Sequence, residues 1–194
     1  MAHTDLRIIR SKKSIRRAFL TLIPQYGFQN ITVQQIADEA FINRKTFYAY
    51  YPSKYDLYNE IADELIQILR PVVKRDPIAV QQSGTFSTVL QKTFEQITLN
   101  RELIKILIED QSNPVFVNKL SELFREDLLY SVKNQKEPVG KLPVDLVERI
   151  YVSTIIEIVK WWVRQDAFPS SELASVYPML FSDEVIRILN IPVL

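Results

Sequence analysis

The 194-residue sequence contains no cysteine, one histidine and only three glycines. Without cysteine, the chain has no disulfide bonds and no thiolate ligands, which permits a location in the reducing cytoplasm. The single histidine, His3, excludes a histidine-based catalytic triad and a site built from several histidines. No P-loop, G-x-G-x-x-G motif or H-E-x-x-H motif occurs. We therefore expect no metal, no cofactor and no enzymatic activity.

Long apolar runs are also missing. No segment approaches the ~20 consecutive apolar residues that a membrane-spanning helix needs, and the first residues lack the apolar region of a signal peptide. We therefore expect a cytoplasmic protein with no membrane partner. Hydrophobic residues make up 47% of the chain, which is ordinary for a globular protein with a real core.

Charge is divided unevenly along the chain, although the whole sequence has a net charge of only +1. Residues 1–54 contain nine basic and three acidic side chains, whereas residues 55–194 contain 15 basic and 20 acidic ones. A basic region on an acidic remainder is typical of DNA-binding proteins, because cationic side chains attract the phosphate backbone. The alternative is that the basic side chains simply lie on a solvated surface with no binding role. Charge alone does not decide between these two interpretations.

Residues 32–54 have the pattern of two short helices joined by a tight turn. Thr32 is a favourable N-cap, and the apolar residues that follow it recur at the spacing of one helical face. Asn43 can cap the second helix, predicted over residues 44–51, which Pro52 ends. Phe47 is its apolar anchor. The polar side chains of this second helix can form hydrogen bonds with phosphates and base edges, although Tyr48 and Tyr50 could instead pack in the core.

This stretch resembles the helix-turn-helix of the tetracycline-repressor-like (TetR) family of bacterial regulators. The resemblance covers roughly residues 10–60, and one departure is Phe41, which stands at the turn where the family usually has glycine. A non-glycine residue there must adopt a left-handed conformation or change the turn. The matching residues are Gly27-Phe28, Ile31-Thr32-Val33, Ile36-Ala37, Thr46-Phe47-Tyr48, Tyr51-Pro52-Ser53-Lys54 and Leu57.

The resemblance implies sequence-specific binding of double-stranded DNA by a homodimer with a near-palindromic operator, most often as a repressor released by a small-molecule effector. It also implies which positions meet DNA. These are Thr32, Gln34, Arg44, Lys45, Thr46, Tyr48, Tyr50 and Lys54.

Helical periodicity continues to the end of the chain, and no segment has the alternation of a strand. We predict an all-α protein of about nine helices. A three-helix DNA-binding head over residues 1–53 precedes a helical regulatory and dimerisation body over residues 54–194. Besides the two short helices, the head contains a helix at 11–27. The helices of the body are expected at 54–70, 85–100, 101–110, 113–134, 143–165, 170–177 and 182–190.

The segment 143–165 has two apolar stripes, which cannot both face one narrow core. The first consists of Val147, Tyr151, Thr154, Ile158 and Trp161, and the second of Val152, Ile155, Ile156, Val159, Trp162 and Val163. A second subunit is the simplest partner for the other stripe, and we therefore expect a homodimer. Polar and aromatic groups of the body could line an effector pocket, although each could also be an ordinary core residue. These candidates are Tyr130, Tyr151, Thr154, Glu157 and Trp161.

Two other functions remain open from the residues alone. A helix-turn-helix regulator could have no ligand of its own and be controlled by a protein partner. A helical enzyme or carrier is the other class, and the shortage of catalytic groups argues against it.

Overall fold

In the computed structural model, the described residues are 2–73, 86–133, 143–165, 168–169 and 171–173. Within these ranges the chain forms helices and no strand, and the predicted all-α fold class is confirmed. The chain divides into two compact units. The N-terminal unit comprises residues 1–64 and 106–116, and the C-terminal unit comprises 65–105 and 117–194. The predicted boundary after residue 53, between a DNA-binding head and a regulatory body, stays a prediction.

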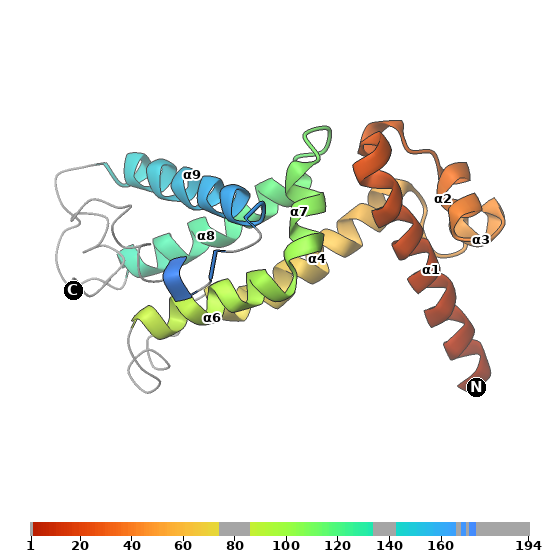
Figure 1. Ribbon diagram of the computed structural model, residues 1–194, viewed down its shortest axis with the longest axis horizontal. Coiled ribbons are helices and arrows are strands. Elements are labelled where there is room, and N and C mark those ends of the chain that lie inside the picture. Colours follow the sequence, from red (N-terminus) through yellow and green to blue (C-terminus); the bar gives the residue numbers. More distant parts are fainter. Residues whose placement is uncertain (1, 74–85, 134–142, 166–167, 170, 174–194) are drawn as a thin grey trace. The chain divides into compact units, whose positions relative to one another are not determined.

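The N-terminal unit contains the predicted helix-turn-helix. Helix α1 (Ala2–Tyr26) and a 3-10 turn, η1 (Phe28–Asn30), precede α2 (Val33–Glu39) and α3 (Arg44–Tyr48) (Figure 1). The first part of α4 (Lys54–Val73) completes this unit. Its core is aromatic, with Phe28 and Tyr58 in edge-to-face contact at a centroid distance of 5.1 Å. The fully buried side chains at its centre are Ile15, Phe19, Phe28, Ile36, Phe47, Leu57 and Tyr58.

Helix α1 begins at Ala2, whereas periodicity predicted a start at residue 11. The apolar stripe behind that prediction begins at Ile15, and the basic residues before it could form either an arm or an N-terminal extension of this helix. The structure has the extension. Two ion pairs attach α1 to α4: Lys12 Nζ lies 2.8 Å from a carboxylate oxygen of Glu60, and Arg16 pairs with Glu64. No glycine or proline interrupts the chain before Pro24, so nothing local ends the helix between residues 2 and 11.

The turn after α7 (Arg101–Glu109) belongs to the N-terminal unit. Asp110 Oδ1 accepts a hydrogen bond from the backbone N–H of Phe28 at 3.5 Å, and the Gln29 side chain donates to the Ser112 carbonyl at 3.0 Å. The Tyr58 hydroxyl donates to the Asn113 carbonyl at 3.3 Å. Burial and the charge of Asp110 raise the pKa of Tyr58, so this hydroxyl stays a donor at neutral pH.

The C-terminal unit contains α6 (Phe86–Leu99), α8 (Val115–Lys133) and α9 (Val144–Trp162), together with the second part of α4 (Figure 1). Helix α6 contacts α9 through Phe94 and Trp162, whose ring centroids are 5.1 Å apart. Helix α8 contacts α9 through an ion pair of 2.6 Å between Arg125 and Glu148. None of the helices in the described ranges is both long enough and apolar enough to cross a bilayer.

Helix α4 continues through Pro71 to Val73, although Pro71 was predicted to end it. Proline removes one backbone hydrogen bond from a helix. Two features of the tertiary structure offset this loss. The Val73 side chain is buried, with 5% of it exposed, and Thr93 Oγ1 donates a hydrogen bond of 2.8 Å to the Val72 carbonyl. Packing therefore maintains a turn that the local sequence disfavours.

Helix α9 differs from its predicted arrangement. The stripe expected to face a second subunit is buried within the protomer, where Val152, Ile155, Ile156, Val159 and Trp162 are all less than 10% exposed. The exposed apolar side chains of α9 lie on another side of the helix. They are Leu146, Ile150 and Trp161, which are 43%, 46% and 45% exposed. The helices predicted at 170–177 and 182–190 lie outside the described residues, except for a helical turn at 171–173.

Candidate nucleic-acid interface

Helix α2 begins with a complete capping box. Thr32 Oγ1 accepts a hydrogen bond from the Gln35 N–H at 3.2 Å, and the Gln35 side chain accepts one from the Thr32 N–H at 2.8 Å. The reciprocal pair satisfies two backbone donors at the start of a helix of only seven residues. Thr32 is exposed, so the predicted phosphate contact is sterically open. Gln34 is exposed as well, and its side-chain amide donates to Asp38 at 2.8 Å.

The turn between α2 and α3 is a Schellman motif with phenylalanine in the position that normally holds glycine. The Ile42 N–H donates to the Ala37 carbonyl at 2.9 Å, and the Phe41 N–H donates to the Asp38 carbonyl at 3.1 Å. Phe41 has a φ of +54°. The chain therefore keeps the turn geometry of a glycine and accepts left-handed strain at this residue.

Helix α3 is short and fixed at both ends. Asn43 Oδ1 accepts hydrogen bonds from the backbone N–H and the hydroxyl of Thr46, at 2.7 and 3.0 Å. Phe47 is fully buried and anchors the helix to the core. The helix ends at Tyr48, three residues before the predicted end, because the Tyr50 N–H turns to the Phe47 carbonyl at 2.9 Å.

The polar side chains predicted to meet DNA surround this anchor. Arg44, Lys45 and Tyr48 are exposed, whereas Thr46 and Tyr50 are half-buried. Arg44 Nη2 donates to the Tyr48 hydroxyl at 3.0 Å, and the guanidinium lies 5.3 Å from the centroid of the Tyr48 ring. Tyr48 therefore positions Arg44 one helical turn away, a coupling that the i, i+4 spacing allows. Sequence reasoning named both residues but did not pair them.

Lys54 has a structural role that sequence reasoning missed. Its ammonium group donates to the carbonyl oxygens of Phe28, Gln29 and Ile31 at 2.9, 2.9 and 2.7 Å. These three bonds use all the donors of the group. Desolvation by burial lowers the pKa of Lys54, and the charge of Asp110 opposes this effect. The predicted phosphate contact of Lys54 stays a prediction, because the ammonium would have to exchange one of these carbonyls for it.

Replacing Lys54 with methionine should destabilise the N-terminal unit by about 1–3 kcal/mol, because it leaves three carbonyls without their donor. Urea unfolding followed by circular dichroism measures this change, and the exposed Lys45→Met variant is the control. Equal stability of Lys54→Met and wild type would contradict the structural role. If Lys54 also contacts a phosphate, Lys54→Met should lower the magnitude of the salt slope of DNA binding by about one per protomer.

Basic side chains continue along α1 on the side away from the core. Arg7, Arg10, Lys13 and Arg17 are all exposed. Lys12 and Arg16 are instead half-buried and paired with acidic residues of α4. Glu60 also accepts a hydrogen bond of 2.7 Å from the Tyr51 hydroxyl. Burial alone would raise the pKa of Glu60, but the hydrogen bonds from Lys12 and Tyr51 lower it, so the carboxylate stays ionised at neutral pH.

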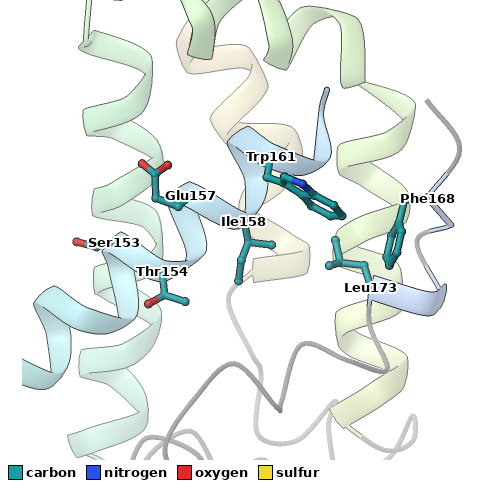
Figure 2. A pocket seen from close by; sticks show the side chains of 7 residues that line it. All are labelled: Ser153, Thr154, Glu157, Ile158, Trp161, Phe168 and Leu173. Atoms are coloured by element: carbon teal, nitrogen blue, oxygen red, sulfur yellow. The ribbon is translucent and has the colours of Figure 1, made fainter. Parts of the chain in front are cut away.

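The C-terminal unit contains a groove of about 650 Å³ along α9 and the segment after it (Figure 2). The rings of Trp161 and Phe168 are in edge-to-face contact, with their centroids 5.3 Å apart. The indole N–H of Trp162 donates a hydrogen bond of 3.1 Å to the Phe168 carbonyl. No group of three potential metal ligands occurs among the described residues. The groove is lined by Ser153, Thr154, Glu157, Ile158, Trp161, Phe168 and Leu173.

The five predicted effector residues separate in the structure. Thr154, Glu157 and Trp161 line the groove. Tyr151 is only 1% exposed and belongs to the core, as its alternative interpretation held. Tyr130 is 47% exposed and lies outside the lining of the groove. Phe168 and Leu173 were missed because the apolar pattern of residues 165–175 is too short to assign to a face.

The arrangement of α1, α2 and α3, with a capped short helix after a tight turn, defines a helix-turn-helix protein. Residues 15–61 match the family model described as bacterial regulatory proteins of the tetR family. Residues 84–176 match the model of a transcriptional regulator C-terminal region. No curated protein matches the chain significantly.

Solved structures share the fold over nearly the whole chain. A TetR transcriptional regulator from Streptococcus agalactiae is 24% identical with a TM-score of 0.72, covering 93% of this chain and 99% of its own. NalD of Pseudomonas aeruginosa, the secondary repressor of the MexAB-OprM efflux pump, is 17% identical with a TM-score of 0.63, covering 89% and 95%. FadR of Bacillus subtilis, solved with stearoyl-CoA, is 20% identical with a TM-score of 0.60, covering 88% and 97%.

The two family models together match most of the chain, and the chain belongs to the TetR family of transcriptional regulators. Members of this family are DNA-binding regulators of transcription and not enzymes.

Proposed function

We propose that this protein binds a near-palindromic operator as a cytoplasmic homodimer and represses transcription until a small molecule releases it. Each protomer places α3 in a major groove, with Arg44 and Lys45 directed to base edges. Thr32, Gln34, Thr46, Tyr48 and Tyr50 supply the surrounding phosphate and base contacts. Lys54 contributes mainly by holding the loop that precedes α2.

The observation that carries the proposal is the construction of α3. One buried side chain, Phe47, and one cap, Asn43, fix a helix whose exposed residues are cationic or hydrogen-bonding. Arg7, Arg10, Lys13 and Arg17 of α1 add exposed cations, and exposed cations strengthen binding to any DNA sequence. Binding to DNA would explain why the basic residues gather in the first 54 positions.

The dimer is proposed to form on the exposed side of α9. Leu146 and Ile150 are one helical turn apart, and both are more than 40% exposed. Two copies of such an apolar pair can meet across a two-fold axis, where each patch faces itself. The groove lies further along the same helix, at Thr154, Glu157 and Trp161.

The groove supports an effector with an apolar or aromatic body. Trp161 and Phe168 offer ring surfaces, and Thr154 and Ser153 offer hydroxyl groups. A volume of about 650 Å³ is within the range of small-molecule sites. An effector releases the operator only if it binds the non-DNA-binding conformation more tightly.

Selection of bound duplexes from a random pool tests the proposal. We expect enrichment of two inverted half-sites about 10 base pairs apart from centre to centre, because two α3 helices read successive major grooves. Affinity for the selected duplex should fall steeply as salt rises. A pool that yields no enriched sequence, with weak and salt-independent binding, would contradict DNA binding and favour the carrier class. The double variant Arg44→Ala, Lys45→Ala is the control and should enrich nothing.

A further inference from the structure

Phe41 combines two features that are unfavourable for the isolated protein. Its backbone is left-handed, with a φ of +54°, and it is the one non-glycine residue with positive φ in the described ranges. Its side chain is 95% exposed, the highest value among the exposed large apolar residues of the described chain. Left-handed geometry is unfavourable for a residue with a Cβ atom, and burial of the ring within the protomer does not offset it.

The backbone of the turn does not need this side chain. Both hydrogen bonds of the Schellman motif come from main-chain atoms, namely the Ile42 N–H to Ala37 and the Phe41 N–H to Asp38. Glycine would form the same two bonds without strain. The ring of Phe41 therefore contributes nothing to the turn, and at 95% exposure it is free to contact a molecule outside the protomer.

The position of Phe41 next to α3 indicates which molecule this would be. It lies two residues before the cap Asn43 and three before Arg44, the first residue of α3. A recognition helix enters the major groove with its N-terminal end, so a side chain on the preceding turn lies beside the strand that borders the groove. Deoxyribose carbons and thymine methyl groups are the apolar surfaces available there.

We propose that Phe41 is a DNA-contacting residue that packs its ring against the sugar edge of the operator next to the entry of α3. This inference rests on the proposed DNA binding. The contact is apolar, so it adds affinity without adding to the salt dependence. It also shields the start of α3 from water and keeps Arg44 and Lys45 at the base edges.

Two substitutions separate the ring from the backbone strain. Phe41→Gly removes both the ring and the strain, whereas Phe41→Ala removes the ring and keeps a Cβ atom at positive φ. We expect Phe41→Gly to melt at a higher temperature than Phe41→Ala and wild type. Both variants should bind the selected operator roughly tenfold more weakly than wild type, the loss expected for exposing a phenylalanine ring that was buried in the complex. The slope of log affinity against log salt should stay at the wild-type value.

The matched control is Tyr26→Ala, which removes another exposed aromatic ring of the same unit, 48% exposed at the end of α1. It should bind the operator like wild type. Wild-type affinity of both Phe41 variants would overturn the contact with DNA. A melting temperature of Phe41→Gly below that of wild type would overturn the strain at Phe41, which is the premise of the inference. If wild type itself selects no operator, the proposed function fails before Phe41 is tested, and the two failures are therefore distinguishable.

Discussion

Arg44→Ala and Lys45→Ala should each weaken binding to the best operator by about 1–3 kcal/mol and relax the base preference at one position of each half-site. Both side chains are exposed on α3, close to its N-terminal end. A cationic side chain in this position can pair with guanine O6 and N7, and Thr46 beside them can meet a thymine methyl. Affinity at fixed salt for the operator and a panel of single-base variants measures both effects.

Tyr48→Phe is the companion variant in this experiment. It should weaken binding and leave the base preference unchanged, because the hydroxyl positions Arg44 and can also reach a phosphate. Its effect and that of Arg44→Ala should not add, since the two side chains form one hydrogen-bonded pair. If all three variants are folded by circular dichroism and bind every sequence like wild type, α3 is not the recognition helix.

Ile150→Glu should convert a wild-type homodimer into a folded monomer and lower operator affinity by roughly 10²- to 10⁴-fold, because the two heads no longer act together. Ile150 is 46% exposed on α9, so a charge at this position is tolerated in the monomer but not at an apolar dimer interface. Light scattering at micromolar concentration measures the mass, and circular dichroism measures the fold.

Leu99→Glu is the matched control, since Leu99 is 76% exposed at the end of α6 and lies outside the proposed interface. It should stay dimeric. Ile156, which the sequence pattern would have selected for this test, is 5% exposed within the protomer, and a charge there would unfold the chain instead. A dimeric Ile150→Glu variant would exclude this side of α9, and a monomeric wild type would exclude the dimer itself.

The sequence by itself determined the features that depend on neighbours within one helical turn. The all-α class, the caps at Thr32 and Asn43 and the anchor Phe47 follow from such patterns, and the structure has them where they were predicted. The reason is physical: an N-cap bonds to a backbone N–H two or three residues away, and helical periodicity repeats every 3.6 residues. The polar surface of α3 could be predicted for the same reason.

The tertiary structure alone decided the roles that depend on distant partners. Lys54 binds carbonyls 23 to 26 residues away, which no local pattern encodes. Contacts from α6 carry α4 past Pro71, and packing within the protomer buries the stripe of α9 that was expected to face a partner. For Phe41 the sequence indicated only a conflict with the turn. The structure resolved this conflict in favour of the turn geometry, because the two main-chain hydrogen bonds of the motif form with phenylalanine as they do with glycine.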